Sequence, residues 1–246
     1  MAATPRAVVA MALLALAGTA RAQAGPPMIT NDPDTPGPGV WEINLAAAGG
    51  AHNGDWDLSA PDLDINRGVG ERVQLSVHGS WAHARADGGW ASGFGDVELG
   101  ARWRFLDQDT AGVSVAVQPL WIHGGSPAAR RRGLASTNPE WVLPIQAAKE
   151  FGSVSIGTEV ARHVVAHEAD AWQAGAFVAH DCRRTITCLA EINATRVDGE
   201  AARATLNIGA RYALREGLLL MGSLGSEVSG VHRQPLVFYL GVQHVR

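Results

Sequence analysis

Residues 93–106 read GFGDVELGARWRFL, and from Asp96 onward charged and apolar side chains alternate along this stretch. One parity carries the charges, on Asp96, Glu98, Arg102 and Arg104, with a glycine at position 100. The other parity is wholly apolar: Val97, Leu99, Ala101, Trp103 and Phe105. Because successive side chains of a β-strand point to opposite faces, the pattern predicts a strand with one apolar face and one charged face.

The same period-two alternation recurs along the chain and predicts an all-β fold. It is clear in residues 72–81, 153–160 and 204–212, whereas no helical period persists beyond the first residues. Longer polar connections, expected at residues 83–93, 123–139, 161–171 and 225–235, alternate with short turns, as in an antiparallel up-and-down meander. We predict about twelve strands, at residues 39–47, 58–66, 72–82, 95–106, 112–122, 140–150, 153–162, 172–181, 187–196, 202–213, 217–226 and 236–245.

Three features favour a membrane barrel over the alternative, a soluble β-sandwich or soluble barrel. Many of the predicted strands approach the roughly 9–11 residues that cross a bilayer at a tilt. The charged parity carries too many ionisable groups for a packed protein core. Aromatic residues lie on the apolar parity near strand ends, as in the girdles of membrane barrels. These residues are Trp41, Trp81, Trp103, Trp121, Trp141, Trp172 and Tyr212. We therefore expect an antiparallel up-and-down transmembrane β-barrel, closed because lipid offers an open sheet edge no partner.

The first residues are typical of a secretory signal peptide. Arg6 precedes an apolar run at residues 7–18, and small residues fit cleavage after Ala22 or Ala24. A membrane anchor is the alternative, but the run is shorter than the ~20 residues that a spanning helix needs. We expect residues 1–24 to be a signal peptide and residues 25–246 to form one barrel domain in the bacterial outer membrane.

The cysteines and the charge narrow the class further. Cys182 and Cys188 are the two cysteines of the chain, and export to an oxidising compartment predicts a disulfide between them in a short turn. A metal pair is the alternative, but no histidine or third thiol lies in the segment. The formal net charge of −4 argues against a nucleic-acid partner.

Charged residues on the inward parity are expected to line the lumen. They are Asp96, Glu98, Arg102, Arg104, Glu159, Glu191 and Arg211. These groups either select solutes or pair with one another in a structural ladder, and inward glycines at positions 100, 157 and 209 are expected to leave room beside them. In the longest connection, Arg130, Arg131 and Arg132 predict a contact with lipopolysaccharide phosphates, which guanidinium groups bind bidentately; a solvated loop is the alternative.

A search for catalytic patterns gives no catalytic residue, metal site or cofactor. The chain has no G-x-S-x-G motif, and residues 93–100 lack the glycine spacing and the helix of a dinucleotide loop. His163, His167, Glu168 and Asp170 could hold a metal ion, but their spacing better fits a polar loop. Ser76 and His78 share the lumen parity and are interpreted as lumen polarity rather than as a hydrolase pair.

Two stretches together resemble the outer-membrane family described as putative meta-pathway of phenol degradation, also called transporters. They are residues 26–45, PPMITNDPDTPGPGVWEINL, and residues 93–106. The matching positions are Thr30, Asp32, Gly39, Trp41, Glu42, Ile43, Gly93, Gly95, Asp96, Glu98, Leu99, Gly100, Arg102 and Phe105. The resemblance implies an outer-membrane β-barrel linked to the uptake of aromatic compounds, with no catalytic residue. The chain departs from the usual aromatic terminus of such barrels, because it ends in His244, Val245 and Arg246.

Together these patterns predict a non-enzymatic outer-membrane channel or transporter for passive passage of small, aromatic or weakly polar solutes. An outer-membrane enzyme acting on lipid or lipopolysaccharide and a structural barrel with a blocked lumen are the alternatives. Short turns are expected to face the periplasm and long loops the exterior. Twelve strands predict a narrow pore, since about eight leave an interior filled by side chains and sixteen to eighteen open a water channel.

Overall fold

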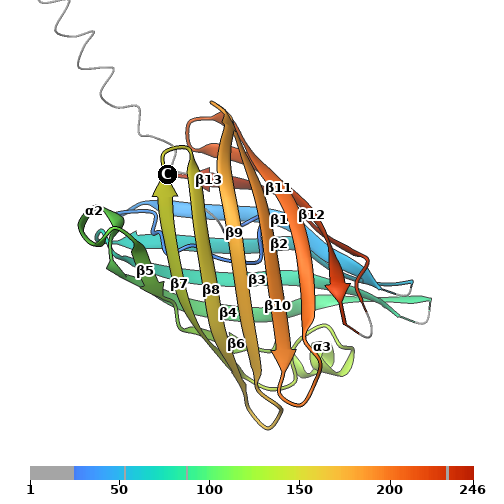
Figure 1. The fold of residues 1–246 in the computed structure, drawn as a ribbon. Helices are drawn as coiled ribbons and strands as arrows, with labels where there is room; N and C mark the ends of the chain where they lie inside the picture. Colours follow the sequence, from blue (N-terminus) through green and yellow to red (C-terminus); the bar gives the residue numbers. More distant parts are fainter. Residues whose placement is uncertain (1–24, 53, 87, 231–232) are drawn as a thin grey trace, which may run out of the picture.

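The computed structural model describes residues 25–52, 54–86, 88–230 and 233–246, so the expected signal peptide lies outside the described residues. These residues form one antiparallel β-barrel (Figure 1). Its strands are β1 (Trp41–His52), β2 (Asp55–Val69), β3 (Val73–Ala86), β4 (Gly89–Leu106), β5 (Ser114–Val117), β6 (Leu120–His123), β7 (Glu140–Phe151), β8 (Val154–Val165), β9 (Ala171–Arg183), β10 (Ile186–Val197), β11 (Arg203–Arg215), β12 (Leu218–Ser229) and β13 (Leu236–Val245). Every predicted strand is present.

The sheet closes because the first strand pairs with the last. β1 and β13 are joined in an unbroken antiparallel register from Glu42↔Val245 to Ala51↔Leu236. The backbone amides of Trp41 and Arg246 donate to each other's carbonyl oxygens at the end of this seam. β5 and β6 both lie between β4 and β7 and are two halves of one predicted strand, so the barrel has twelve strands in cross-section. The break falls at Gln118 and Pro119, where proline has no amide hydrogen for the ladder.

Two short helices mark the two ends of the barrel. α2 (Gln108–Ala111) lies in the turn between β4 and β5, at the same end as the C-terminus, and α3 (Pro127–Arg131) lies in the β6–β7 connection at the other end (Figure 1). We call these the α2 end and the α3 end. The structure corrects three of the four long connections that the sequence predicted. Residues 83–86 and 89–93, 161–165 and 225–229 continue as strands, so β3 runs to Ala86 and β4 begins at Gly89.

The outward face is apolar, as the alternation predicted. Leu99 is 44% exposed and Trp103 is 56% exposed on β4, while Arg102 between them is 7% exposed and points inward. The predicted aromatic residues also face outward, in a group near each end of the barrel: Trp41, Trp103 and Tyr212 at the α2 end, and Trp81, Trp121, Trp141 and Trp172 toward the α3 end. No helix in the described part of the chain is long and apolar enough to cross a membrane.

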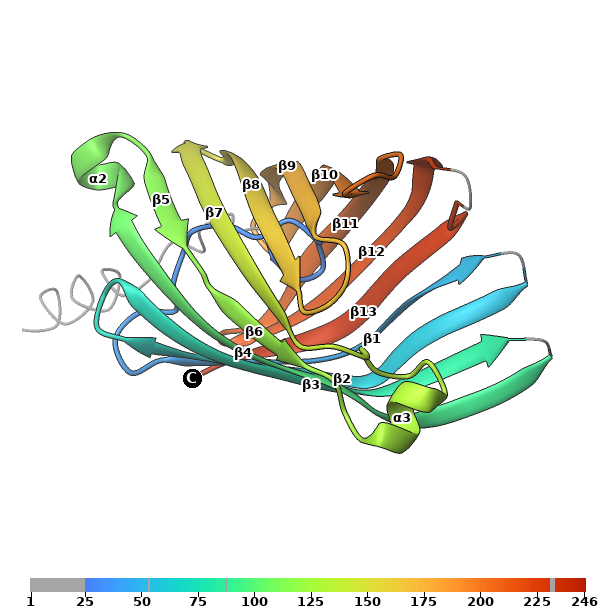
Figure 2. The same ribbon diagram turned by 90° about the horizontal axis from the view of Figure 1, so that it is seen from below.

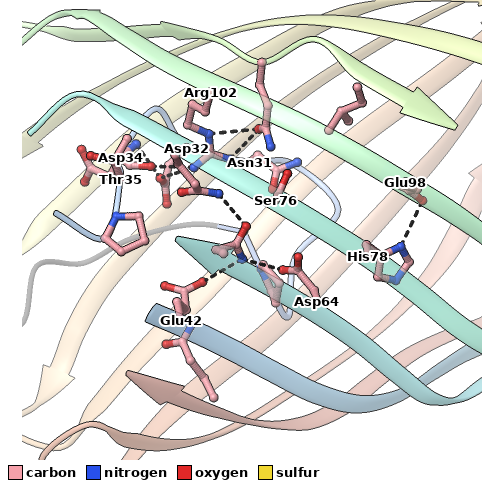
Figure 3. Close-up of a pocket in the computed structure, with 18 of the residues that line it drawn as sticks. Asn31, Asp32, Asp34, Thr35, Glu42, Asp64, Ser76, His78, Glu98 and Arg102 are labelled. Carbon is pink, nitrogen blue, oxygen red and sulfur yellow. Dashed lines mark hydrogen bonds and ion pairs between the residues drawn. The ribbon is translucent and has the colours of Figure 1, made fainter. Parts of the chain in front are cut away.

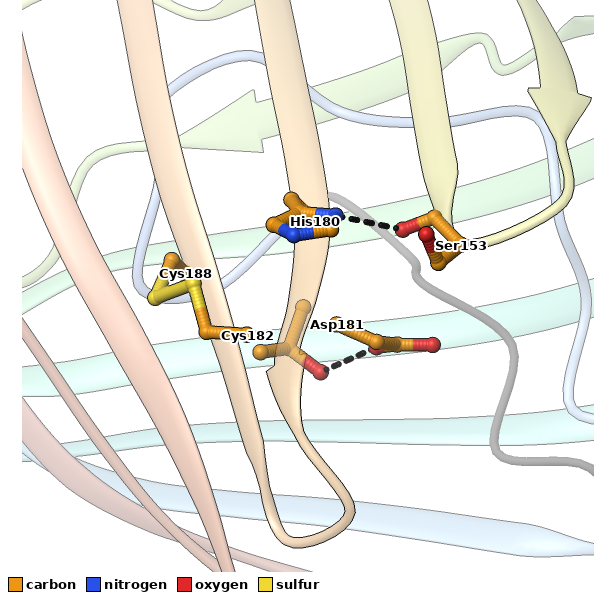
Figure 4. Close-up of a disulfide and its surroundings, with 6 residues drawn as sticks. Ser153, His180, Asp181, Cys182 and Cys188 are labelled. Carbon is orange, nitrogen blue, oxygen red and sulfur yellow. Dashed lines mark hydrogen bonds between the residues drawn. A yellow bond between two sulfur atoms is a disulfide. The ribbon is translucent and has the colours of Figure 1, made fainter.

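A disulfide joins Cys182 to Cys188 across the turn between β9 and β10, as predicted (Figure 4). The two Cα atoms lie 5.9 Å apart, and the turn itself is at the α2 end. Next to the bridge, the Thr187 hydroxyl donates to Asp181 Oδ1 at 2.9 Å, and the two residues are register partners. The bridge therefore closes a hairpin that strand pairing already holds.

The outward face generates a test of which side meets lipid. Replacing Leu99 with arginine places a charge midway along β4 on the apolar face, and we expect the free energy of unfolding from a bilayer to fall by about 2–4 kcal/mol. The matched variant Ser76→Arg puts the same charge on the inward parity of β3 and should lose much less. Urea unfolding of both variants in lipid vesicles measures the difference. Equal losses would contradict the assignment of the two faces.

Candidate functional site

Residues 25–40 do not join the barrel sheet; they enter its lumen at the α2 end, turn, and return to begin β1 (Figure 2). We call this segment the plug. Its turn lies deep among lumen side chains, and Thr30 is 0% exposed. The sequence did not predict the plug, because these residues show no alternation and their partners are remote in the chain.

Glu191 of β10 holds the turn of the plug. Its two carboxylate oxygens accept the backbone amides of Ile29 and Thr30 at 2.8 and 2.7 Å. Asn207 of β11 donates its Nδ2 to the same carboxylate at 3.0 Å, and Glu191 itself is 5% exposed. A carboxylate that accepts several N–H groups is a strong anchor, because bonds to an ionised group are worth about twice those between neutral groups.

Neighbouring strands bind the carbonyl oxygens of the plug. Arg211 of β11 donates hydrogen bonds from its Nε and Nη2 atoms to the Pro26 carbonyl oxygen, at 2.9 and 2.6 Å. The Ser223 hydroxyl of β12 donates to the Pro27 carbonyl oxygen at 2.7 Å. Side chains of two neighbouring strands therefore hold the plug by its backbone carbonyl oxygens.

The returning arm of the plug is held by the arginines of β4. Arg102 Nη1 donates to the Asp34 carbonyl oxygen at 2.6 Å and lies 3.9 Å from the Asp32 carboxylate. Arg104 forms an ion pair with the Asp34 carboxylate at 3.0 Å. On β8, Glu159 accepts hydrogen bonds from Asn31 and from Gln146, the latter at 2.7 Å.

Inward glycines at positions 157 and 209 do not leave the lumen open, contrary to the expectation, because other side chains fill the space beside them. A Cβ at Gly209 would overlap the methyl group of Met28, and one at Gly175 would overlap Thr30. At Gly157 the space is filled by the Phe177 ring. At these three positions the lumen is therefore filled, by the plug beside Gly175 and Gly209 and by Phe177 beside Gly157.

On the opposite side the plug leaves an inner chamber of about 240 Å³ next to β1–β4 (Figure 3). Glu42 and Asp64 lie there, and both accept hydrogen bonds from Asn44 and Asn66. His78 lies between two further carboxylates, with Nε2 3.1 Å from Asp62 and Nδ1 3.1 Å from Glu98. Arg102 and Arg211 line the side nearest the plug. The chamber thus has carboxylates on the barrel wall and arginines beside the plug.

An outer chamber of about 460 Å³ lies beyond the turn of the plug, toward the α3 end. Pro27, Met28 and Ile29 form its floor, and inward residues of β1, β3 and β13 form its walls. Tyr239 of β13 lines both chambers, so its ring lies at the boundary between them. These two chambers therefore lie along one side of the barrel with the plug and Tyr239 between them, and a further space of about 270 Å³ lies beside Asn193 of β10 and Thr205 of β11.

The lumen residues predicted from sequence all face inward, but most of them hold the plug. Arg102, Arg104, Glu159, Glu191 and Arg211 each contact it, which is neither free solute selection nor a ladder of wall charges. Glu98 pairs with His78 instead. Asp96 fastens a loop, since its carboxylate accepts from the backbone amide and the hydroxyl of Ser136.

The three loop arginines are placed differently from one another. Arg130 donates to the carbonyl oxygens of Gly124 and Gly125, so it shapes its own loop. Arg132 donates to the Ala128 carbonyl oxygen at 3.3 Å and leans over Gly93. Arg131 and Arg132 are exposed.

The candidate chemical groups of the sequence have other partners. Both ring nitrogens of His78 contact carboxylates, so this histidine is not a base for Ser76. Figure 3 shows the contact with Glu98. His163 contacts Glu140 and Gln173, while Asp170 pairs with Arg162 at 2.9 Å. No cluster of three metal-ligating side chains occurs among the described residues.

Asp32 carries the clearest electrostatic shift of the plug. Burial raises the pKa of its carboxyl to about 7, and the neighbouring Asp34 carboxylate raises it further, while Arg102 and Arg211 oppose the shift. In the docked plug, Asp32 therefore keeps its proton at pH values between 3.8 and about 7, where an ordinary aspartate carboxyl has lost it.

Comparison with solved structures places this fold among known barrels. An outer-membrane channel from Pseudomonas putida F1 superposes with a TM-score of 0.67 at 13% identity, over 92% of this chain and 98% of that chain. The KdgM porin gives 0.60 at 12% identity over 82% and 98%, and the NanC porin gives 0.57 at 9% over 84% and 99%. The chain therefore has the fold of outer-membrane β-barrels. No family model and no curated protein sequence matches it.

The Asp32 pKa predicts that docking of the plug weakens as pH rises. A carboxyl with a pKa of 3.8 when undocked and about 7 when docked binds its proton preferentially in the docked state. The ratio of docked to undocked plug should therefore fall by at most about tenfold per pH unit across that window and level off above it. The 13C-methyl NMR signal of Met28 reports this ratio. Asp32→Asn should remove most of the dependence, and an equally steep change in that variant would contradict the assignment.

Proposed function

We propose that the protein is a channel of the bacterial outer membrane, reached after cleavage of residues 1–24, for passive passage of small, weakly polar or aromatic solutes. The observation that carries the proposal is what fills the lumen and what space is left beside it. A segment outside the sheet occupies it, and two chambers remain beside that segment along β1–β4 and β13. Because the obstruction is not part of the sheet, its displacement would open a route without breaking the barrel.

The fold comparisons support the channel in this proposal without identifying the solute. Solved barrels of the same fold carry the names porin and channel, and one KdgM structure is described as a complex with disordered oligogalacturonate. The aromatic solute class rests on the resemblance of residues 26–45 and 93–106 to the phenol-degradation family. The apolar outward belt, with its two aromatic groups, supports residence in a bilayer.

Two details bear on the alternatives and on the lipid partner. The engagement of His78 by two carboxylates disfavours an enzyme built on that residue. A barrel whose lumen stays blocked is the second candidate, and the docked plug is the observation that favours it. Of the three loop arginines, Arg131 and Arg132 are exposed, whereas Arg130 is bound to its own loop. We therefore propose that the contact with lipopolysaccharide phosphates is made mainly by Arg131 and Arg132.

Removing the anchor of the plug should open the channel. In Glu191→Ala the amides of Ile29 and Thr30 lose their acceptor, at a cost of about 1–3 kcal/mol for each buried donor left unpaired. We expect wild-type protein in planar bilayers to give rare, small conductance steps and the variant to give larger and more frequent ones. Glu168→Ala, in an outer loop, is the matched control and should behave as wild type. A folded Glu191→Ala barrel that never conducts would leave the blocked barrel as the better account.

The arginines beside the inner chamber should set its ion preference. Arg102→Ala with Arg104→Ala removes two positive charges from the lumen, that of Arg102 from the lining that it shares with Glu42, Asp64 and Glu98, so the reversal potential in a salt gradient should shift toward cation selectivity. Arg184→Ala with Arg215→Ala removes two exposed arginines at the α2 end and controls for net charge. An equal shift in both double variants would show that the lumen charges do not govern selectivity.

A further inference from the structure

Two carboxylates of the inner chamber have no cation in contact with them. Glu42 of β1 and Asp64 of β2 form no ion pair within the described part of the chain, whereas the other two wall carboxylates share His78. The arginines that line the chamber are bound to carbonyl oxygens of the plug instead. A carboxylate confined in a narrow lumen needs a compensating group, because it has lost part of its hydration.

The two carboxylates are held close together on the chamber wall (Figure 3). Asn66 Nδ2 donates to Asp64 Oδ2 at 2.8 Å and lies 3.5 Å from Glu42 Oε1. Asn44 Nδ2 contacts the same two oxygens, at 3.0 Å for Asp64 and 3.3 Å for Glu42. The two amides fix the position of both carboxylates but carry no charge that would neutralise them. One cationic group on the chamber side can therefore contact both.

Amide groups without partners open onto the same chamber. Gln243 of β13 is 7% exposed and lines the chamber beside its register partner Asn44, and its side chain forms no hydrogen bond with any described residue. Gln74 of β3 is 5% exposed, and its Nε2 donates to Asn66 Oδ1 at 2.7 Å, which leaves its Oε1 without a partner among the described residues. Unlike the enclosed Asn44 Oδ1, both groups retain surface that a ligand can reach.

This set of acceptors suits a primary ammonium group better than a metal ion. An ammonium group carries one positive charge and three N–H donors, which two carboxylates and one amide oxygen satisfy. Ca²⁺ takes about six to eight oxygen ligands, and the described residues contain no cluster of three metal-ligating side chains. The chamber volume of about 240 Å³ is below the roughly 300–1,000 Å³ of ordinary ligand pockets, so the molecule must be compact.

The acceptors lie near the α2 end of the barrel. Glu42 is the second residue of β1, Gln74 is the second residue of β3, and Gln243 is the third residue from the end of β13. The turn of the plug lies deeper, beside Glu191, the sixth residue of β10. A cation that enters from the α2 end therefore reaches the two carboxylates without passing the turn of the plug.

We infer that the inner chamber is a binding site for a compact primary ammonium ion, held by the carboxylates of Glu42 and Asp64 and by an amide oxygen of Gln243 or Gln74. The inference goes beyond the proposed function, because it concerns a cationic ligand and not a weakly polar or aromatic solute. It depends neither on conductance nor on displacement of the plug. The bound cation supplies the charge that the two carboxylates lack.

Side-chain amide NMR tests the site, with ethylammonium chloride as the probe. In 15N-labelled protein in phosphatidylcholine nanodiscs, at constant ionic strength, the Gln243 signal should shift saturably. Gln173, which contacts His163 outside the chamber, is the internal reference and should not shift. Tetramethylammonium has the same charge but no N–H donor, so it should bind at least about tenfold more weakly. Ethanol, which has a donor but no charge, should give no saturable shift.

Matched substitutions locate the charge that binds the probe. Glu42→Gln and Asp64→Asn each remove one carboxylate with little change in size and should weaken ethylammonium binding by about tenfold. Asp57→Asn removes the same charge from the wall of the outer chamber and is the control. Gln243→Glu adds a third carboxylate and should tighten binding by about threefold or more, read from the Gln74 signal. A folding defect cannot produce this gain, and retained heat-modifiable mobility shows that each variant is folded.

Four outcomes would overturn the inference: equal affinity for tetramethylammonium; a saturable effect of ethanol; unchanged binding in both Glu42→Gln and Asp64→Asn; or an equal loss in Asp57→Asn. A saturable shift of Gln243 with Ca²⁺ and none with ethylammonium would also overturn it, in favour of a metal site. Its failure is distinguishable from failure of the channel. Saturable binding in a protein that never conducts would preserve the site and remove the channel, whereas conductance without binding would preserve the channel and remove the site.

Discussion

Closure of the sheet on itself is the constraint on which the rest of the structure depends. The unbroken register between β1 and β13 satisfies the edge groups of both strands and leaves a ring without an edge. Once the ring is closed, each strand has one side that faces outward and one that faces the lumen. The alternation therefore places Val97 and Leu99 outside and Glu98 inside. Lipid on one side and confined polar groups on the other then follow from the covalent sequence alone.

Closure also creates a problem, because it confines several charges inside a narrow space. A guanidinium or carboxylate removed from water needs partners, and wall residues on neighbouring strands supply only some of them. The plug supplies the others with its backbone. Glu191 receives amide hydrogens, whereas Arg211 finds a carbonyl oxygen, so one segment of chain satisfies charges of both signs. The inward glycines make room for the plug. Its position in the lumen is otherwise explained more by the charged groups that it satisfies than by shape.

The strands and the facing of their residues could be predicted because both depend on local alternation. The pattern around Leu99 and the turn closed by Cys182 and Cys188 each lie within one hairpin, and the facing of each outward aromatic residue follows from the alternation of its own strand. The break between β5 and β6 also had a local signal, because Pro119 lies within a predicted strand and has no amide hydrogen for the ladder. The extension of the strands beyond the apolar belt could not be predicted, because polar residues lie on both faces of the strands there and the apolar–polar alternation is lost.

The plug and the two chambers could not be predicted, because their contacts join distant parts of the chain. Ile29 and Glu191 are 162 residues apart, and nothing in the sequence near either one indicates the other. What the sequence did contain was a surplus of inward charges without obvious wall partners, and a proline- and glycine-rich segment, residues 25–40, without alternation. The two signals together indicate a segment inside the barrel, although neither indicates where it binds.

The plug remains covalently joined to β1 through residues 31–40, and Gly39 and Val40 are hydrogen-bonded to Gly68 at the rim. A released turn therefore cannot diffuse away. A tether this short keeps it at an effective concentration on the order of millimolar beside its own anchor. Reclosing is then a first-order event that is independent of protein concentration and needs no second subunit. For this barrel the lifetime of an open state is set by chain length and by how quickly Glu191 is found again, as in an intramolecular ligand rather than a dissociable inhibitor.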